Sequence, residues 1–430
     1  MVLNVVHAPT RWDFGGTEKA AELFIRGHSE EFNAYGVGLH QGGPRSDSLR
    51  ESGYDVHEAD GVDDLAEYMS EKEIDIVHSH SGDSELISTA AAKAGVPIHV
   101  RTDVFGNYFE MDSGSGIDYF FYPSKTILLR TLILNNIGLG GDWEVDMAHL
   151  YNPLDMTEVT QGESLREEYG IPDSVPVVGK IGRPVPEKWG KLTIRAFDRV
   201  VEQNPTAELF LIGVPDKIRK QIRSYQWEDQ VTYADPLPLK KVSDFYATID
   251  ILAHTSAIGE SYGYVIAEAM ANGVPPVVDS TPMRDNAQVE MVQNGETGYV
   301  ANSPVAYGDA ISELLDKQDK YQQFSDAAKE RVLEFDVNRV VTRLEKFYER
   351  LAADAGLIQS DSTRSFDALT EDMSEFKTEY THRIGTAFGD QDVLHRLERT
   401  SWKGVEKLPV GRKTAFELFR KGFIFSNEYV

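Results

Sequence analysis

The sequence predicts an α/β protein with two doubly wound, Rossmann-like domains and an extra C-terminal tail. Short apolar runs alternate with longer amphipathic stretches from residue 2 to residue 124. The alternation breaks at 149–176, which is rich in Pro, Asn, Asp and Gly, and then restarts. Strands that alternate with helices form parallel sheets covered by helices, and a chain of 430 residues has room for two or three domains.

In the first half, the expected strands are short and apolar, and the expected helices carry one apolar face. The strands are residues 2–8, 34–40, 75–81, 96–103 and 119–124. The helices are residues 16–29, 63–74 and 84–95, and the last of these ends at a glycine. Each helix lies between two strands, as the crossover connections of a parallel sheet require.

The second half repeats this pattern. The expected strands are residues 175–183, 207–214, 230–235, 250–256, 275–279 and 295–301. The expected helices are residues 191–203, 239–249, 264–273 and 304–317. We therefore place an N-terminal domain at 1–155, a linker at 156–175, a C-terminal domain at 176–355 and an extension at 356–430.

The extension is expected to begin with a polar linker at 356–375 and to continue as helix. Basic residues outnumber acidic ones in 394–430, although the whole chain is acidic. Phe416, Phe419 and Phe423 are spaced to share one helical face. Such a helix can pack against the rest of the protein or lie in a membrane interface, and the sequence leaves both alternatives open.

The composition excludes several classes of protein. A net charge of −27 argues against a nucleic-acid binder, and the lack of cysteine excludes disulfides, thiolate metal sites and cysteine catalysis. No apolar run reaches the roughly 18 residues of a spanning helix, and the N-terminus does not resemble a signal peptide, so we expect a cytoplasmic protein. The strongly acidic composition also fits a salt-loving source.

Two carboxylates flank the start of a predicted helix in the stretch GESYGYVIAEAMANGVPPVVD (259–279). Glu260 lies in the loop after a strand, and Glu268 lies inside the helix. The helix N-terminus between them favours a phosphate, and carboxylates accept hydrogen bonds from sugar hydroxyls. This arrangement fits a nucleotide sugar. The alternative is a solvated loop acid followed by an acid that the helix dipole favours.

Three further features lie where predicted strands end. Arg183 and Lys188 follow the first strand of the second half, where they can neutralise phosphate or can be ordinary surface charges. Gly15 and Gly16 let the backbone approach a phosphate, although GxGxxG spacing is absent. A histidine pair at 78–80 lies on one face of a strand, but no third ligand is evident nearby, so we expect no metal site.

Together these residues resemble the retaining glycosyltransferases of family 4, which have the two-domain GT-B fold. The resemblance covers about residues 1–350 and is strongest from 177 to 301. The residues that match family motifs are Glu260 and Glu268 (E-x7-E), Gly182, Arg183 and Lys188 (GR…EKG, with Trp189 inserted before Gly190), Gly15 and Gly16 (GG), and Asn152 and Asp155 (YNPLD).

The resemblance implies a role for each candidate residue. Glu260 would contact the hydroxyls of the donor sugar, and Glu268 would hold the ribose. Arg183 and Lys188 would neutralise the leaving diphosphate. The remaining donor-binding residues would be Gly15, Gly16, Ser261, Tyr262, Gly263 and Tyr264. The resemblance implies no cofactor and no metal.

One position departs from the family pattern. Many relatives have a histidine at the end of the fourth strand, six residues after a proline that corresponds to Pro97. This chain has Asp103 there. We count Asp103 among the candidate catalytic residues, because an acid can bind a sugar hydroxyl or the acceptor. The same change also fits altered donor choice or an inactive binding module.

The function that follows is retaining transfer of a sugar from a nucleotide sugar to an acceptor hydroxyl. The acceptor would be a glycan, a glycolipid or a lipid-linked glycan, and the basic tail would allow peripheral contact with the inner face of a membrane. Two alternatives stay open: a non-catalytic scaffold that binds nucleotide sugars, and a nucleotide-sugar epimerase of the same fold.

Overall fold

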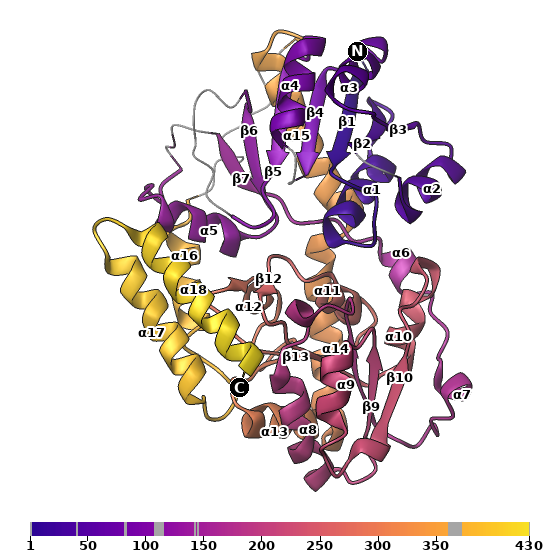
Figure 1. Cartoon of the computed structure of the whole chain (residues 1–430), viewed down its shortest axis with the longest axis vertical. Coiled ribbons are helices and arrows are strands. Elements are labelled where there is room, and N and C mark those ends of the chain that lie inside the picture. Colours follow the sequence, from indigo (N-terminus) through magenta and orange to yellow (C-terminus); the bar gives the residue numbers. More distant parts are fainter. Residues whose placement is uncertain are drawn as a thin grey trace. The chain divides into compact units, whose positions relative to one another are not determined.

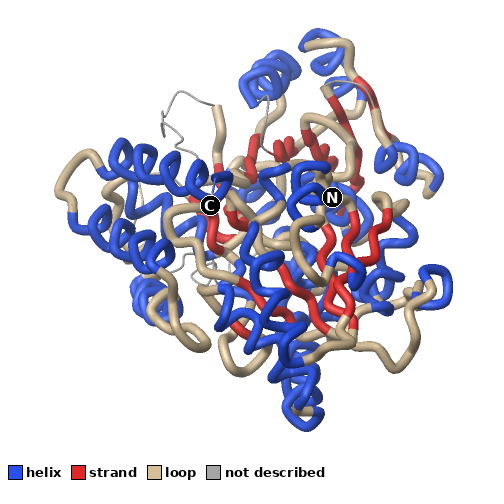
Figure 2. Tube along the Cα trace, turned by 60° about the horizontal axis from the view of Figure 1, so that its bottom comes forward, coloured by secondary structure: helices blue, strands red, loops and turns tan. Residues whose placement is uncertain are grey.

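The computed structural model describes residues 2–39, 42–80, 84–106, 116–141, 143, 146–359 and 372–429. The chain divides into two compact units (Figure 1). Unit 1 comprises Met1–Leu132, Asn136–Asp155 and Glu334–Ser374; unit 2 comprises Ile133–Asn135, Met156–Leu333 and Glu375–Val430. Figure 2 shows the strands in red and the helices that cover them in blue.

Within the described residues, unit 1 carries a seven-stranded parallel sheet. Its strands are β1 (Leu3–Pro9), β2 (Phe32–Gly38), β3 (Val56–Glu58), β4 (Ile76–His80), β5 (Ile98–Thr102), β6 (Tyr119–Tyr122) and β7 (Met147–His149). They pair in the order β3-β2-β1-β4-β5-β6-β7, so the direction of winding reverses between β1 and β4. In doubly wound folds, ligands bind at this reversal, beyond the carboxyl ends of the strands.

The helices of unit 1 present one apolar face to the sheet. α1 (Gly16–Gly27) buries Ala20, Leu23 and Phe24, which are spaced to share one side of the helix. The other helices are α2 (Pro44–Glu51), α3 (Val62–Glu71), α4 (Ser84–Ala94), α5 (Lys125–Leu134) and α15 (Val337–Asp354). α15 comes late in the chain but packs against α1.

Unit 2 repeats the topology. Its described parallel sheet contains β8 (Val177–Ile181), β9 (Glu208–Ile212), β10 (Val231–Ala234), β11 (Ile251–His254), β13 (Pro276–Val278) and β15 (Tyr299–Val300). The order β10-β9-β8-β11-β13-β15 again reverses once, between β8 and β11. A separate two-stranded pairing joins β12 (Gly259–Glu260) to β14 (Asp285–Asn286).

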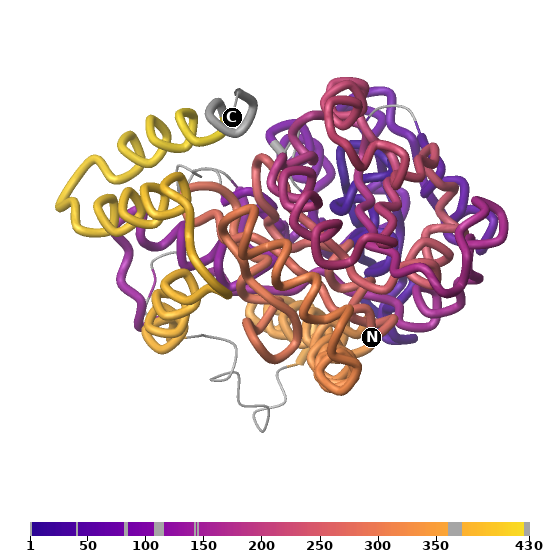
Figure 3. The backbone as a smooth tube through the Cα atoms, turned by 90° about the horizontal axis from the view of Figure 1, so that it is seen from below, coloured from indigo at the N-terminus to yellow at the C-terminus, as the bar shows by residue number. Residues whose placement is uncertain are grey.

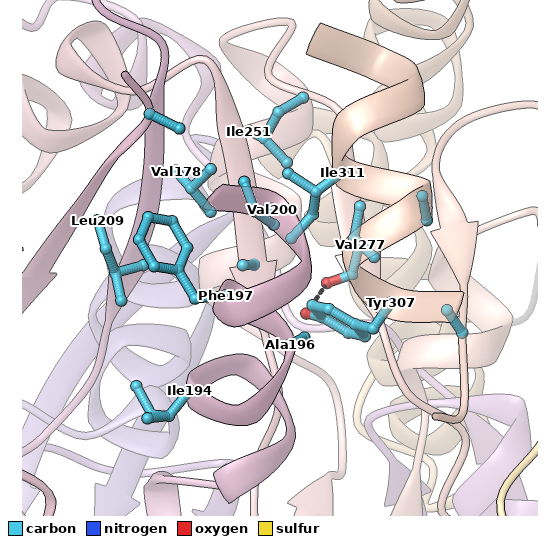
Figure 4. Packing of buried hydrophobic residues seen from close by; sticks show 14 of the residues in the cluster. Val178, Ile194, Ala196, Phe197, Val200, Leu209, Ile251, Val277, Tyr307 and Ile311 are labelled. Carbon is cyan, nitrogen blue, oxygen red and sulfur yellow. Dashed lines mark hydrogen bonds between the residues drawn. The ribbon is translucent and has the colours of Figure 1, made fainter. Parts of the chain in front are cut away.

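The helices of unit 2 lie between and after these strands. They are α6 (Met156–Val159), α7 (Arg166–Tyr169), α8 (Lys191–Gln203), α9 (Asp216–Ile222), α10 (Val242–Thr248), α11 (Tyr264–Ala271), α12 (Gln288–Met291), α13 (Pro304–Asp316) and α14 (Gln318–Val332). Figure 4 shows the core between α8, α13 and the sheet, where Phe197 packs among aliphatic residues and the hydroxyl of Tyr307 donates to the carbonyl of Val277.

The C-terminal extension is helical, as predicted, and its described part from residue 375 onward belongs to unit 2. It contains α16 (Ser374–Arg383), α17 (Val393–Lys407) and α18 (Arg412–Tyr429). α17 and α18 form a hairpin, drawn in yellow in Figures 1 and 3. Most of the polar linker predicted at 356–375 lies outside the described residues. Within the described ranges, no helix is both long and apolar enough to cross a bilayer.

The compact units depart from the predicted boundaries in two places. Residues 156–175, predicted as a linker, group with unit 2, where the amide of Leu165 donates to Thr248 Oγ1 and the guanidinium of Arg166 binds Asp250. Helix α15, predicted as the end of the second domain, groups with unit 1. The reason is physical contact, since Glu345 of α15 binds His28, next to α1.

Candidate active site

The two motifs predicted in the second half directly follow two neighbouring strands of unit 2. β8 and β11 are directly hydrogen-bonded, with Val178 opposite Ile251. Arg183 and Lys188 follow β8, and the loop Ser256–Glu260 follows β11. Because the winding reverses between these two strands, both segments lie at the strand ends where doubly wound folds bind ligands.

A lysine–glutamate ion pair joins the two segments. Lys188 Nζ lies 3.0 and 2.9 Å from the two carboxylate oxygens of Glu260. His254, the last residue of β11, places its Nε2 atom 3.1 Å from Glu260 Oε1. The side chains of Lys188 and Glu260 are 23% and 11% exposed, so the pair is largely desolvated but still reachable.

This environment keeps Glu260 ionised. Burial favours the neutral carboxyl, but the charge of Lys188 and the hydrogen bond from His254 lower the pKa of Glu260 to about 2. Burial also lowers the pKa of His254, so its neutral ring donates the Nε2 proton to Glu260. An ionised Glu260 acts solely as an acceptor, which suits the hydroxyl groups of a sugar.

Trp189, the residue inserted in the motif, closes the turn that carries Arg183 and Lys188. The short 3-10 helix η1 (Pro186–Lys188) ends at this buried tryptophan. Its Nε1 atom donates to the carbonyl of Arg183 at 3.0 Å, which ties the two ends of the turn together. The side chain of Arg183 is exposed.

Lys180 is a buried lysine that the sequence analysis missed. It lies on β8, its Nζ atom donates to the carbonyl of Thr255 at 2.6 Å, and the ring of Trp189 lies 5.2 Å away. Burial lowers its pKa to about 7, although Asp279 and Glu260 favour the charged form. A lysine inside the apolar strand sequence VVGKI was the signal that could have identified it.

The start of α11 follows Glu260 closely. Gly263 is the N-cap residue and has φ +102°, a conformation that favours glycine. Tyr262 is buried, whereas Ser261 and Tyr264 are partly exposed. The backbone N–H groups of the first turn therefore lie just after the ion-paired glutamate, and such groups attract anions.

Glu268 has a different environment from Glu260. It is 4% exposed and accepts a hydrogen bond from the hydroxyl of Tyr246 on α10 at 2.5 Å. Burial, together with the charge of Glu268, raises the pKa of Tyr246 well above its ordinary value, so the phenol keeps its proton and remains a donor. The two glutamates of the motif are thus held by different partners.

The remaining predicted residues lie in unit 1. Gly15 is the N-cap of α1, and Gly16 is the first residue of that helix. The loop between β1 and α1 also lines an open pocket of about 740 Å³. The lining residues are Arg11, Asp13, Leu39, Gly42, Glu58, Ala59 and Asp60.

Asp103 lies directly after β5 of unit 1 and is 4% exposed. Burial raises its pKa, although Arg101 and the backbone N–H of Phe105 act in the opposite direction. That N–H lies 3.3 Å from Oδ1, while Oδ2 has no hydrogen-bond partner among the described residues. A buried carboxyl oxygen without a partner can bind a ligand hydroxyl.

Four histidines of unit 1 form a buried network that the sequence analysis did not predict. His7 on β1 lies opposite His78 on β4 in the pairing register. His7 Nδ1 is 2.9 Å from His80 Nε2, and His7 Nε2 is 3.0 Å from His28 Nε2. His28 Nδ1 is in turn 3.1 Å from Glu345 Oε1.

The expectation that no third ligand lies near His78 and His80 is therefore wrong. Nitrogen atoms of His7, His78 and His80 lie within 4.8 Å of one another, because strand pairing brings His7 alongside the other two. The two nitrogens of His78 already contact Tyr348 Oη at 2.6 Å and Thr102 Oγ1 at 2.7 Å. A metal would have to displace such hydrogen bonds, and the absence of a metal stays a prediction.

Comparison with known proteins finds a family that part of the chain resembles. Residues 161–331 match the sequence model of the family described as Glycosyl transferases group 1, and this stretch includes Lys188 and Glu260. Over this stretch, the chain is similar to the group 1 glycosyltransferases. It is 29% identical over 197 residues to the D-inositol 3-phosphate glycosyltransferase of Corynebacterium glutamicum, with coverage of 43% of this chain and 46% of that protein.

A second protein with sequence similarity to this chain is the N-acetyl-alpha-D-glucosaminyl L-malate synthase of Bacillus anthracis. The two are 27% identical over 214 residues, which is 47% of this chain and 53% of that protein. The chain thus spans about half the length of the curated relatives it matches.

Solved structures share the fold over most of this chain. Anabaena HepE in complex with UDP and glucose has a TM-score of 0.65 and 17% identity, with coverage of 81% of this chain and 100% of that chain. A glycosyltransferase from Rickettsia africae has a TM-score of 0.66 and 15% identity, with coverage of 84% and 100%. The GT-B fold class predicted from the sequence is confirmed.

We expect the folding stability of unit 1 to fall as the pH drops below about 6.5. Burial lowers the pKa of His80 to about 3 and that of His99 to about 4, and it lowers those of His7 and His78 as well. Below pH 6.5 the unfolded chain binds protons that the folded chain does not. The stability that these buried histidines contribute above pH 6.5 is therefore lost progressively as the pH falls toward their pKa values in the folded protein.

At pH 5, the loss from His80 and from His99 should be on the order of 2 kcal/mol each. Hydrogen exchange of β1 and β4 in urea, at pH 7 and at pH 5, measures this loss. The variant His80→Gln should reduce the pH dependence, whereas the exposed His382→Gln serves as a control. Equal stability at the two pH values would contradict the prediction.

Proposed function

We propose that the protein is a retaining glycosyltransferase that moves a sugar from a nucleoside-diphosphate sugar to an acceptor hydroxyl. The observation that carries the proposal is the Lys188–Glu260 pair, held at the ends of β8 and β11 just before the N-terminus of α11. An ammonium group, an ionised carboxylate and a helix N-terminus suit a diphosphate and the hydroxyls of the attached sugar.

In the proposed reaction, the bond between sugar C1 and the diphosphate oxygen breaks, and the acceptor oxygen bonds to C1 on the same face. The acceptor's proton passes to the departing diphosphate oxygen. Negative charge grows on the diphosphate as the bond breaks, so Lys188 and Arg183 stabilise the transition state more than the bound donor. The ammonium group of Lys188 has three donors, which allows it to bind phosphate while it holds Glu260.

The other candidate residues have supporting roles in this proposal. Glu268 holds the ribose, whose hydroxyl would share the carboxylate with Tyr246. Gly16 and Tyr264 supply backbone N–H groups to the donor. Asp103 Oδ2, which has no hydrogen-bond partner among the described residues, binds a hydroxyl of the sugar or of the acceptor.

The comparisons suggest which donors to test first. HepE of Anabaena was solved with UDP and glucose, so UDP-glucose is the first candidate, followed by GDP- and ADP-glucose. The curated relatives are named for different acceptors, inositol phosphate and malate. For this chain we propose a glycan, a glycolipid or a lipid-linked glycan as the acceptor.

A membrane-bound acceptor is supported by the surface of the extension. Residues 394–430 contain eight Lys and Arg against four Glu, within a chain of net charge −27. Val410, Leu418 and Phe419 are 75%, 69% and 47% exposed. Phe416, by contrast, is buried and packs against Trp402. The aromatic face predicted for this helix is therefore buried at Phe416 and exposed at Phe419. We propose that the exposed apolar residues and the neighbouring cations contact anionic lipids.

The paired glutamates should affect the reaction differently. Glu260→Ala should lower kcat by about 100-fold or more, because it removes a contact to the sugar that changes in the transition state. Glu268→Ala should mainly raise KM for the donor, because the ribose does not change during the reaction. Steady-state kinetics with the preferred donor measure both effects.

The exposed Glu296, also in unit 2, offers a matched control, and Glu296→Ala should keep wild-type kinetics. Wild-type turnover by Glu260→Ala would reject the assigned role. Donor that binds but is neither transferred nor hydrolysed would indicate a scaffold, and conversion of the donor to its epimer would indicate an epimerase.

The membrane contact is tested by flotation with vesicles that contain anionic lipid. Full-length protein should float at low salt and less at high salt, because salt screens the attraction. The double variant Leu418→Glu/Phe419→Glu should stay at the bottom of the gradient. Val305 is also exposed, at 59%, so Val305→Glu is the control and should float. Full-length protein that does not float even at low salt would exclude the membrane contact.

A further inference from the structure

The C-terminal extension lies outside the stretch that matches the family, which ends at residue 331. Its helices α16 and α17 nevertheless place buried side chains against residues 279–290, which we call the platform. The platform in turn contacts residues 256–260, which we call the donor loop because it ends at Glu260. Extension, platform and donor loop all belong to unit 2.

The platform holds the donor loop through its backbone. β14 of the platform pairs with β12, so that Gly259 lies opposite Asp285. The amide of Ala287 donates to the carbonyl of Glu260 at 2.8 Å. Gly259 has φ +74°, and a Cβ there would lie 1.7 Å from the carbonyl oxygen of Asp285, so the two segments approach as closely as glycine permits.

The extension forms hydrogen bonds and an ion pair with the platform through buried polar side chains. Glu398 of α17 accepts from Arg284 Nε at 3.1 Å, from Arg284 Nη2 at 3.0 Å and from the amide of Met283 at 3.1 Å. The side chains of Arg284 and Glu398 are 1% and 0% exposed. From α16, the hydroxyl of Tyr380 lies 3.0 Å from the side-chain amide nitrogen of Asn286.

Arg284 connects these contacts to the donor loop. Its remaining terminal nitrogen, Nη1, donates to the carbonyl of Ser256 at 3.2 Å and to that of Ala257 at 2.8 Å. The same guanidinium thus binds Glu398 on one side and two consecutive carbonyls of the donor loop on the other. Its planar shape fixes the direction of all these bonds together.

We propose that Glu398 and Arg284 are positioning residues that set the donor loop, and hence Glu260, for the reaction. The C-terminal extension then supports the donor loop through the platform and is part of the donor site rather than an accessory tail. This inference rests on the proposed function where it assigns Glu260 to the donor sugar. The order of the donor loop itself can be measured without any donor.

The test replaces the ion pair by apolar residues of similar length, in the double variant Arg284→Met/Glu398→Met. A buried ion pair can often be exchanged for apolar side chains without loss of stability, but methionine cannot donate to the carbonyls of Ser256 and Ala257. We expect a melting temperature close to that of the wild type. Amides of residues 256–260 should exchange hydrogen about tenfold faster or more, and kcat should fall by a similar factor.

The ion pair between Glu22 and Arg45 in unit 1 provides the control, because both side chains are less than a tenth exposed. The variant Glu22→Met/Arg45→Met should leave exchange in the donor loop unchanged. Wild-type exchange of this loop in Arg284→Met/Glu398→Met would overturn the inference. Absence of turnover in the wild type would instead reject the proposed function and leave the exchange result valid.

If the double methionine variant does not fold, Glu398→Gln keeps the shape of the side chain and removes its charge. Faster exchange confined to residues 256–260 would then support positioning. Equal acceleration in the donor loop and in strands β9 and β10 would show that Glu398 stabilises the whole unit, and would overturn the inference.

Discussion

The pairing of β8 with β11 is the constraint on which the candidate site depends. Parallel strands end at the same edge of a sheet, so the segments that follow these two strands must lie close together. One segment brings Lys188 and the other brings Glu260, and their contact at 2.9 Å follows from this topology. Residues 72 positions apart in the chain are thereby in direct contact.

Because this contact is desolvated, it decides the protonation state of Glu260. A buried carboxylate would normally become neutral, but Lys188 and His254 keep Glu260 ionised and aligned. The loop that carries Glu260 is supported in turn by the platform and by the pair Arg284–Glu398, which is fully buried. The loop that ends at Glu260 is thus held in place by side chains far along the chain.

The alternation of strands and helices predicted both sheets, because periodicity follows directly from burial. Strands β3 and β7 were missed because their sequences, VHE and MAH, contain no run of β-branched or aromatic residues. Local spacing also could not show contacts set by strand order or by distant helices, such as His7 with His78, or Glu398 with Arg284. The motifs singled out Lys188 and Glu260, which the structure brings into contact, and their role stays a prediction. The cytoplasmic location and the salt-loving source stay predictions.

The central claim is that Lys188 and Glu260 work as a single unit, and a double-mutant cycle tests it most directly. The variants are Lys188→Met, Glu260→Gln and their combination, each measured as kcat/KM for the donor. If the two residues act together, the combination should lose little more than the worse single variant, with a coupling free energy of about 1.4 kcal/mol or more. Losses that simply multiply would contradict the account, because they would show that the residues act independently.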